Sequence, residues 1–211
     1  MGSVIGVEGG IGAGKTTFVQ KLADALQFRA VHEPVDTELL EAFYQDPAAN
    51  AYDFQFDMML KRWDAHDLCQ CEARSGFEYR GAILDRTLVG DRVFARMHHR
   101  AGNINDRQWR IYERFFTKAL SKFETPAVLV YLDVDPVVAL ERVRKRRRGA
   151  EAEMSLDYLT NLRKEYLDLL SEIEAKQHQW SAGMEIVRLP WNVDHQDIDP
   201  VASMLKDFLR I

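Results

Sequence analysis

The sequence predicts an α/β protein in which a five-stranded parallel sheet is covered by helices on both faces. Short apolar runs alternate along the chain with longer segments of helical periodicity. The first apolar run, residues 3–7, leads directly into a glycine-rich stretch, and a helical segment follows it. Buried strands that alternate with helices form parallel sheets with helices on each side, so these observations define the fold class.

The first half of the chain supplies three of the five strands. Each predicted strand is a short apolar run, and the helix after residue 51 places Phe56, Met59 and Trp63 at helical spacing. After the first strand, the elements expected in this half are, in order, a helix over residues 18–26, a strand over 28–32, helices over 37–45 and 52–75 and a strand over 81–85.

The second half contains the strongest strand signal, residues 127–132, which are β-branched and aromatic-rich. Pro136 opens a helix, because proline is favoured in a first helical turn, and a basic segment over 142–149 then interrupts the pattern. The elements expected here are, in order, helices over 90–99 and 106–122, a strand over 127–132, helices from 136 and over 156–175, a strand over 184–189 and a helix over 199–209.

Composition restricts the class of protein. With 211 residues, 46% of them hydrophobic and 29% charged, the chain is expected to form one globular domain over residues 1–211. The net charge of -5 disfavours a general nucleic-acid binder, and no apolar run is long enough to span a membrane. Cys69 and Cys71 are expected to be free thiols. No signal peptide is recognisable, so a cytoplasmic location is expected.

The glycine-rich stretch fits the phosphate-loop pattern G-x-x-x-x-G-K-[ST]. Its glycines let the backbone turn sharply and direct N–H groups at a phosphate. Lys15 adds a positive charge beside the β- and γ-phosphates, and the Thr16 hydroxyl is a candidate magnesium ligand. The sequence therefore predicts a site for ATP and Mg²⁺. The residues expected to bind the nucleotide are Gly9, Gly10, Ile11, Gly12, Ala13, Gly14, Lys15, Thr16 and Thr17.

Charged residues follow two further predicted strands, at the edge where parallel α/β sheets bind ligands. Glu33 is a candidate base for a hydroxyl that attacks a phosphate, with a solvated loop carboxylate as the alternative. Asp85 is a candidate magnesium ligand, and Arg86 could neutralise charge on the acceptor oxygen. A simple ion pair between Asp85 and Arg86 is the alternative.

The basic segment 142–148 has three interpretations: a solvated helix face, a nucleic-acid patch or a lid over a triphosphate. Beside a phosphate loop the lid is the most economical, and we expect it over about residues 142–153. Four polar residues on predicted helices could belong to the site or simply to the surface. Gln55 and Arg62 lie seven apart and so share a helix face; the others are Tyr44 and Asp91.

Six short motifs stand in order along nearly the whole chain. They connect the phosphate loop, the strand ends, two helical segments and the basic segment. The motifs are Glu8-Gly-Gly-Ile-Gly-Ala-Gly-Lys-Thr-Thr17, Glu33-Pro34-Val35, Tyr44-x-x-Pro47, Phe54-Gln55, Asp85-Arg86-Thr87 and the arginine segment that ends at Glu151.

In type, order and spacing these motifs resemble the deoxynucleoside kinase family, in particular its deoxycytidine, deoxyguanosine and bacterial deoxyadenosine kinases. The resemblance implies a three-layer P-loop kinase fold with an arginine-rich lid. It also implies transfer of the γ-phosphate of ATP to the 5′-hydroxyl of a deoxynucleoside in nucleotide salvage, and a homodimer packed through helices. No nucleic-acid or membrane partner is expected.

The same resemblance implies roles in catalysis and ATP binding. Glu33 would be the base for the 5′-hydroxyl, Arg86 would hold its oxygen, and Lys15 would act on the phosphates. The metal would be held by Thr16 and Asp85. The lid residues that would contact ATP are Arg142, Arg146 and Arg148.

Other residues would bind the nucleoside. Tyr44 and Glu151 would bind the 3′-hydroxyl, Gln55 would pair with the base edge, and Phe54 would stack on the base. Phe94 belongs to the same set, although it stands one residue earlier than the aromatic of many relatives.

The pair Arg62 and Asp91 resembles a pair that thymidine-preferring members tend to lack. We therefore expect purine deoxynucleosides to be preferred, deoxycytidine to come next and thymidine last. Two alternatives stay open from the sequence, namely a nucleoside monophosphate kinase of the thymidylate type and a non-catalytic nucleotide-binding regulator. The carboxylate of Glu33 stands where a monophosphate would carry its charge, which disfavours the first.

Overall fold

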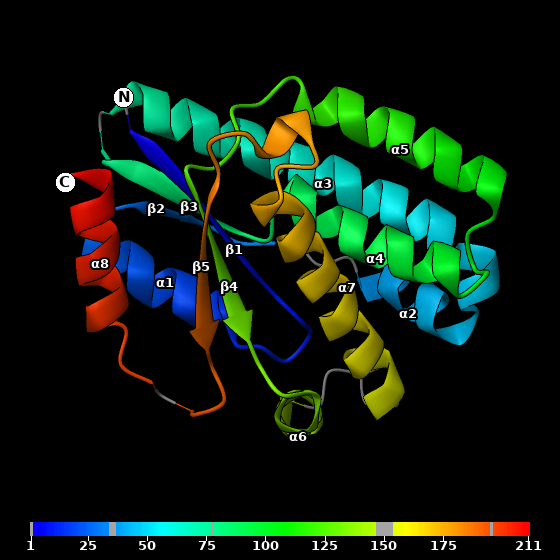
Figure 1. Cartoon of the computed structure of the whole chain (residues 1–211). Coiled ribbons are helices and arrows are strands. Elements are labelled where there is room, and N and C mark those ends of the chain that lie inside the picture. Colours follow the sequence, from blue (N-terminus) through cyan, green and yellow to red (C-terminus); the bar gives the residue numbers. More distant parts are fainter. Residues whose placement is uncertain (1, 34–36, 77, 147–153, 195) are drawn as a thin grey trace.

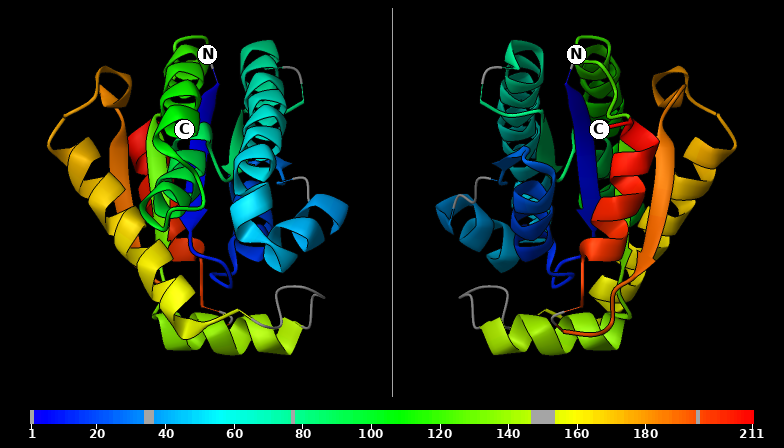
Figure 2. Two further views of the ribbon diagram at one scale, coloured as in Figure 1. Left: turned by 90° about the vertical axis from the view of Figure 1, so that its right-hand side faces the viewer. Right: turned by 90° about the vertical axis from the view of Figure 1, so that its left-hand side faces the viewer.

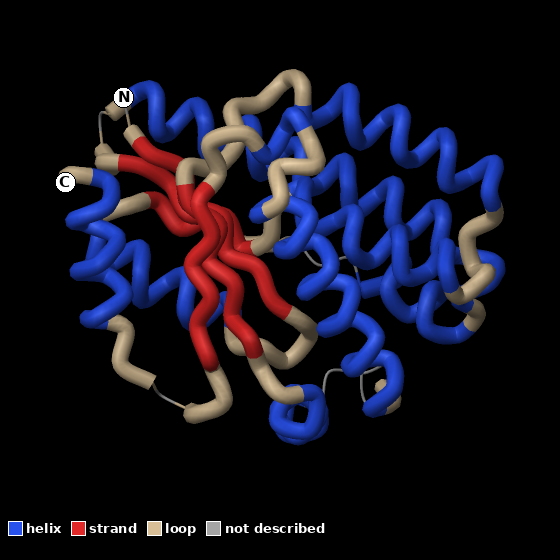
Figure 3. The backbone as a smooth tube through the Cα atoms, in the orientation of Figure 1, coloured by secondary structure: helices blue, strands red, loops and turns tan. Residues whose placement is uncertain are grey.

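A computed structural model of the chain contains the expected five-stranded parallel sheet, in the order β2-β3-β1-β4-β5 (Figure 1). It describes residues 2–33, 37–76, 78–146, 154–194 and 196–211. All neighbouring strands run parallel, so their carboxyl ends lie together at the lower edge of the sheet in Figure 3. The strands are β1 Ser3–Gly9, β2 Arg29–Val31, β3 Gly81–Asp85, β4 Val128–Asp133 and β5 Glu185–Pro190.

Helices cover both faces of this sheet, which gives three layers (Figures 1 and 2). One face carries α1 (Lys15–Leu26) and α8 (Asp199–Leu209), and the other carries α3 (Pro47–Ser75), α4 (Leu88–Arg100) and α7 (Leu156–Glu174). Figure 2 shows α6 (Pro136–Arg146) lying across the carboxyl ends of the strands. The remaining elements are α2 (Thr37–Gln45), which precedes α3, α5 (Asp106–Leu120), which packs on α3 and α4, and the short η2 (Gln179–Ser181).

The central strands are mostly apolar because both of their faces are buried. On β4, Val128 and Val130 belong to the core under α1 and α8, whereas Leu129 and Tyr131 belong to the core under α4 and α7. Successive side chains of a strand point to opposite faces, so one continuous apolar run serves two cores. The sheet is thereby fixed between two helical layers, and its carboxyl edge is left for a site.

Several boundaries differ from the sequence prediction. Strand β1 continues to Gly9, and α1 begins at Lys15 rather than at residue 18. Helix α3 begins at Pro47, where the side chain of Asp46 accepts a hydrogen bond from the backbone N–H of Ala49 at 3.0 Å and caps the helix. The basic segment does not interrupt the pattern at 142, because α6 continues to Arg146. The first part of that segment is therefore helical.

Two smaller expectations can also be compared with the structure. Cys69 is buried, Cys71 is exposed, and both are free thiols, as the sequence predicts. None of the helices in the described ranges combines the length and the apolar character that a bilayer crossing requires.

A buried histidine connects α3 to the start of α4. His66 is almost fully buried, and its Nε2 accepts a hydrogen bond from the backbone N–H of Leu88 at 3.1 Å. Burial lowers the pKa of His66 from 6.5 to about 4. The folded protein therefore excludes a proton that the unfolded chain binds, so stability falls as the pH drops from 6.5 toward 4.

Replacing His66 with glutamine should remove this acid sensitivity, because glutamine supplies an acceptor oxygen but does not titrate. Between pH 7 and pH 5 we expect the wild type to lose about 2 kcal/mol more unfolding free energy than His66→Gln. Urea denaturation at the two pH values measures the difference. An equal loss in both proteins would show that His66 accepts the proton in the folded state.

Candidate active site

The phosphate loop lies between β1 and α1, at the carboxyl edge of the sheet. Gly12 and Gly14 have positive φ angles of 78° and 83°, a conformation that favours glycine. A Cβ on Gly12 would also lie 2.5 Å from the carbonyl oxygen of Ala139, so α6 approaches the loop closely there. Helix α1 has no side-chain cap at its N-terminus, and its first N–H groups face the loop. Such an arrangement binds anions, which fits a phosphate group.

Lys15 is the buried cation of this loop. Its ammonium donates hydrogen bonds to the carbonyl oxygens of Gly9 at 3.2 Å and Gly10 at 2.9 Å. Burial, with a further contribution from the positive charge of Arg86, lowers the pKa of Lys15 from 10.5 to about 7, although Asp85 and Glu33 act in the opposite direction. A bound triphosphate would restore the charge, because nearby negative charge favours the protonated form.

Proton uptake should therefore accompany nucleotide binding. At pH 8, where Lys15 is largely neutral, we expect a non-hydrolysable ATP analogue to bind with uptake of about one proton, and with almost none at pH 6. Calorimetric titrations in buffers of different ionisation enthalpy measure this number. Lys15→Arg is the control, because arginine keeps a permanent charge and should abolish the uptake. Binding at pH 8 without uptake would contradict the lowered pKa.

Asp85 and Thr16 face each other beside the loop. The hydroxyl of Thr16 donates to Oδ2 of Asp85 at 2.6 Å, and Nδ1 of His32 lies 4.0 Å from the same oxygen. The other carboxylate oxygen, Oδ1, is buried and accepts no hydrogen bond within the described ranges. The same ranges hold no group of three or more His, Cys, Asp or Glu side chains that could bind a metal alone. These oxygens fit a Mg²⁺ ion that takes its other ligands from phosphate and water.

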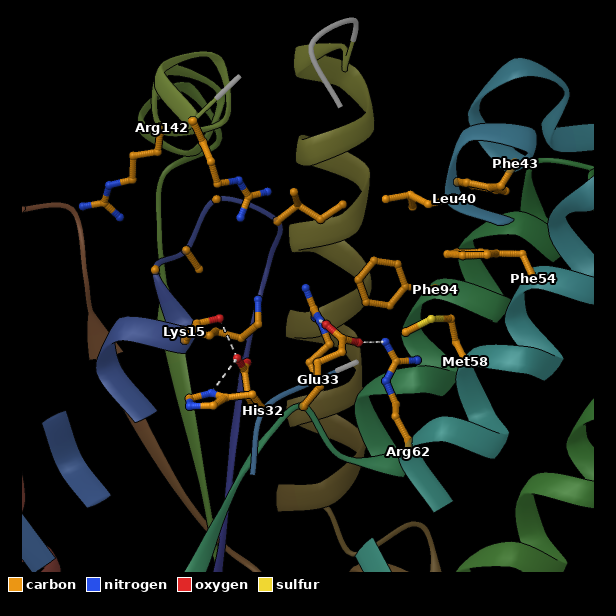
Figure 4. A pocket seen from close by; sticks show the side chains of 18 of the residues that line it. Lys15, His32, Glu33, Leu40, Phe43, Phe54, Met58, Arg62, Phe94 and Arg142 are labelled. Atoms are coloured by element: carbon orange, nitrogen blue, oxygen red, sulfur yellow. Dashed lines mark hydrogen bonds and ion pairs between the residues drawn. The ribbon is translucent and has the colours of Figure 1, made fainter. Parts of the chain in front are cut away.

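Glu33 pairs with two arginines in the site, and Figure 4 shows it facing one of them, Arg62. Nε of Arg86 donates to Oε2 of Glu33 at 3.0 Å, and Nη2 of Arg62 donates to Oε1. Burial acts to raise the pKa of Glu33, but the charges of Arg62 and Arg86 outweigh it and hold that pKa below 4.5. Glu33 is only 18% exposed, so it is not a solvated loop carboxylate. Arg86 pairs with Glu33, not with its neighbour Asp85.

A second buried pair lies beneath Glu33. Nη1 of Arg62 donates to Oδ1 of Asp91, and the hydroxyl of Tyr112 donates to Oδ2 of the same carboxylate. Arg62 and Asp91 are both buried, so neither is a surface residue. Nε of Arg62 is buried without a hydrogen-bond partner in the described chain. This nitrogen is a donor that a ligand could satisfy.

The far end of the site is an apolar slot between α2, α3 and α4. The rings of Phe43 and Phe54 stack with centroids 4.8 Å apart, and the guanidinium carbon of Arg86 lies 4.7 Å from the centre of the Phe94 ring. Oε1 of Gln55 is buried there and accepts no hydrogen bond from any described residue. A planar polar ligand would fit such a slot, stacking on the rings and pairing with Gln55.

The aromatic slot, the side chains of Arg62 and Arg86 and the phosphate loop all line one cavity of about 470 Å³. Arg142 reaches it from α6, where Nε donates to Asp194 at 2.9 Å and Nη1 donates to the carbonyl oxygen of Trp191 at 3.0 Å. Arg148 and Glu151 lie outside the described residues. The predicted residues that line the cavity are Ile11, Gly12, Ala13, Gly14, Lys15, Thr16, Thr17, Glu33, Tyr44, Phe54, Gln55, Arg62, Asp85, Arg86, Phe94, Arg142 and Arg146.

Three predicted residues contribute from behind the cavity wall. Gly9 and Gly10 present carbonyl oxygens to Lys15, and Asp91 holds Arg62. Sequence reasoning assigned no role to a further set of residues. Most have ordinary core chemistry, and only Glu8, an acid inside an apolar strand, carries a signal. The set comprises His32, Leu40, Phe43, Met58 and Tyr158, which line the cavity, and Glu8 and Tyr166, which lie behind it.

The model of a family described as deoxynucleoside kinase matches residues 5–204. The chain is 32% identical over 206 residues to the deoxyadenosine kinase of Dictyostelium discoideum, covering 97% of this chain and 78% of that one. It is 30% identical over 178 residues to the deoxyadenosine/deoxycytidine kinase of Bacillus subtilis, covering 82% and 79%. Its fold is similar to that of the deoxyadenosine kinase from M. mycoides with bound dCTP, with a TM-score of 0.78, 21% identity and 98% of each chain covered.

Proposed function

Since the chain belongs to the deoxynucleoside kinase family and is thus an ATP-dependent deoxynucleoside kinase, we propose that it phosphorylates the 5′-hydroxyl of purine deoxynucleosides first. One observation carries the phosphate transfer in this proposal. A single cavity joins the phosphate loop to the aromatic slot, and Glu33 lies at the junction (Figure 4). A nucleoside with its base in the slot would place its 5′-hydroxyl beside Glu33, with the oxygen of that hydroxyl facing the phosphate loop.

The phosphate-loop end would hold the phosphoryl donor. Bound ATP–magnesium would supply the transferable γ-phosphoryl group and a cation at its oxygens. Lys15 and the N–H groups of the loop would hold the β- and γ-phosphates, as their positions at the start of α1 suggest. Thr16 and Asp85 would hold the cation, because their oxygens face one another and Oδ1 of Asp85 is otherwise unsatisfied.

Glu33 and Arg86 would act on the acceptor hydroxyl. Glu33 would accept its hydrogen bond, orient a lone pair toward the phosphorus and take the proton as the new P–O bond forms. The bond between the γ-phosphorus and the β,γ-bridging oxygen would break in the same transfer, with ADP as the leaving group. Arg86 would hold the same oxygen and offset the charge that develops on it. The lowered pKa makes Glu33 a weak base, which suits phosphoryl transfer, since a loose transition state requires little proton removal before bond formation.

The remaining roles complete the proposal. Phe54 and Phe94 would flank the base, and Tyr44 would bind the 3′-hydroxyl together with Glu151. Arg142 and Arg146 line the cavity from α6, and we propose that with Arg148 they belong to a lid over about residues 142–153 of a single domain, 1–211. A lid that closes on substrate would exclude water from the phosphate.

The base preference rests on the polar groups of the slot. Gln55 offers both a donor and an acceptor, which matches the mixed edge of adenine or cytosine. The buried Arg62–Asp91 pair would favour an exocyclic amine and disfavour the methyl group of thymine. Two relatives are named deoxyadenosine kinase and deoxyadenosine/deoxycytidine kinase, which supports deoxyadenosine and deoxycytidine as substrates. The order that we propose is purines first, deoxycytidine next and thymidine last.

We further propose a cytoplasmic salvage enzyme that acts as a homodimer, with no nucleic-acid or membrane partner. Leu60 on α3 is 51% exposed and Ile111 on α5 is 47% exposed, beside the half-buried rings of Phe56, Trp63 and Phe115. A second copy would cover this apolar surface. Sedimentation at micromolar protein should give a dimer for the wild type and for the control Val137→Asp, and a monomer for Leu60→Asp.

The test of function is phosphate transfer from ATP–magnesium to deoxyadenosine, deoxyguanosine, deoxycytidine and thymidine, with thymidine monophosphate beside them. We expect kcat/KM to follow the order given above. A highest kcat/KM for thymidine would overturn the preference. Transfer to the monophosphate alone would indicate a thymidylate-type kinase, and ATP binding without any transfer would indicate a regulator.

A further inference from the structure

Glu8 places a fully buried carboxylate inside β1, directly behind the site. Its Oε1 accepts hydrogen bonds from the backbone N–H of Thr87 at 2.7 Å and from the Thr87 hydroxyl at 2.8 Å. Its Oε2 accepts a hydrogen bond from the hydroxyl of Tyr166 at 2.9 Å. Burying a carboxylate is unfavourable unless hydrogen bonds compensate for the lost water, so these three contacts are needed to keep it there.

The first two contacts fix an unusual backbone turn. Arg86 has a φ of 72°, in the left-handed region that residues other than glycine seldom adopt. Its own N–H donates to the carbonyl oxygen of Val7 at 3.0 Å, and the next residue, Thr87, is bonded to Glu8. Strand β1 therefore holds the turn through hydrogen bonds to Arg86 and to Thr87. These bonds fix the position of the Arg86 Cα, from which its side chain extends.

The third contact reaches the end of that side chain. Nη1 of Arg86 donates to the hydroxyl oxygen of Tyr166 at 2.6 Å and to the carbonyl oxygen of Gly9 at 2.9 Å. Because the Tyr166 oxygen accepts from Arg86, its proton is directed at Glu8. The guanidinium is thus held at Nη1 by Tyr166 and Gly9, and its Nε donates to Glu33.

The surrounding sequence leaves room for this carboxylate. A Cβ added to Gly90, in the first turn of α4, would lie 2.2 Å from both carboxylate oxygens of Glu8. Any larger side chain at that position would displace Glu8 or push α4 away. Three other segments, namely the turn after β3, the first turn of α4 and α7, therefore meet at one buried acid of β1.

We propose that Glu8, acting through Thr87 and Tyr166, is a positioning residue that fixes Arg86 and, through it, Glu33. Its effect on rate rests on the proposed function, whereas its effect on the Arg86 side chain does not. Neither Glu8 nor Tyr166 lines the cavity, and the hydrogen bonds that connect them to it lead to Arg86 and to Thr87 beside it.

The experiment compares Tyr166→Phe and Glu8→Gln with Tyr131→Phe. Tyr131 packs against Tyr166 with ring centroids 5.4 Å apart, so its change removes a hydroxyl from the same ring cluster. The first readout is the ¹⁵N signal of the Arg86 Nε–H group, assigned by its absence in Arg86→Lys. The second is kcat and KM, with the thermal midpoint of each variant as a check on folding.

For Tyr166→Phe we expect the Arg86 signal to shift and broaden and kcat to fall between about tenfold and about a hundredfold, with KM for ATP nearly unchanged. Tyr131→Phe should change neither readout. An unmoved Arg86 signal in folded Tyr166→Phe, or a kcat loss no larger than that of Tyr131→Phe, would overturn the proposal. A moved signal in a protein without any kinase activity would instead count against the proposed function alone. Glu8→Gln, if folded, should give the same pattern.

Discussion

Replacing Glu33 with glutamine is expected to lower kcat by a factor between about 10² and about 10⁴, the range typical of a lost general base. Glutamine keeps the size of the side chain, but it cannot take the proton of the acceptor hydroxyl. Its amide would also meet the donor groups of Arg62 and Arg86, which now point at carboxylate oxygens. Initial rates with saturating ATP and deoxyadenosine measure the effect.

Two comparisons make this result specific. ATP binding should change far less than kcat, because the hydrogen bonds of Glu33 go to Arg62 and Arg86 and its charge is only one of several contributions to the pKa of Lys15. Glu41→Gln, an exposed carboxylate on α2, should retain wild-type kcat. If Glu33→Gln kept more than about a tenth of kcat, the hydroxyl proton would have another acceptor, and Glu33 would serve only to orient the sugar.

Removing Arg62 alone should destabilise the protein strongly. Arg62→Met would leave Asp91, which is fully buried, with Tyr112 as its remaining polar partner. Breaking a buried ion pair in this way typically lowers the unfolding free energy by about 3–5 kcal/mol. Arg74→Met provides the control on the same helix, because its pair with Glu124 is exposed and should be worth at most about 1 kcal/mol.

The double variant Arg62→Met/Asp91→Asn separates the cost of the unpaired charge on Asp91 from the cost of the lost packing of Arg62. Asparagine removes the unpaired charge and still accepts from Tyr112, so we expect it to recover more than half of the lost stability. Binding of deoxyadenosine should not recover, since the pair is proposed to read the base. Guanidinium denaturation and calorimetry provide the two measurements. A double variant as unstable as Arg62→Met would attribute the loss to packing instead of charge.

The fold was largely predictable from local patterns. The apolar runs of β1, β3 and β4 and the periodicity of α4 and α7 each depend on neighbouring residues, so their positions followed from the sequence. The start of α3 was placed five residues too late, because its early turn begins with Pro47 capped by Asp46 and lacks strong apolar periodicity. The continuation of α6 to Arg146 was not predicted, because a run of like charges has no apolar periodicity and a lid was preferred to a solvated helix face.

The sequence by itself determined the phosphate loop and the placement of Glu33, Asp85 and Arg86 at one edge. A loop between a strand and a helix, and the common direction of parallel strands, are sufficient for that. What only the tertiary structure decided is which distant groups meet. Arg62 pairs with Asp91 and Glu33, Tyr166 joins Glu8 to Arg86, and burial lowers the pKa of Lys15. These contacts join residues up to 158 positions apart, and they depend on how helices pack on the sheet, which no local pattern encodes.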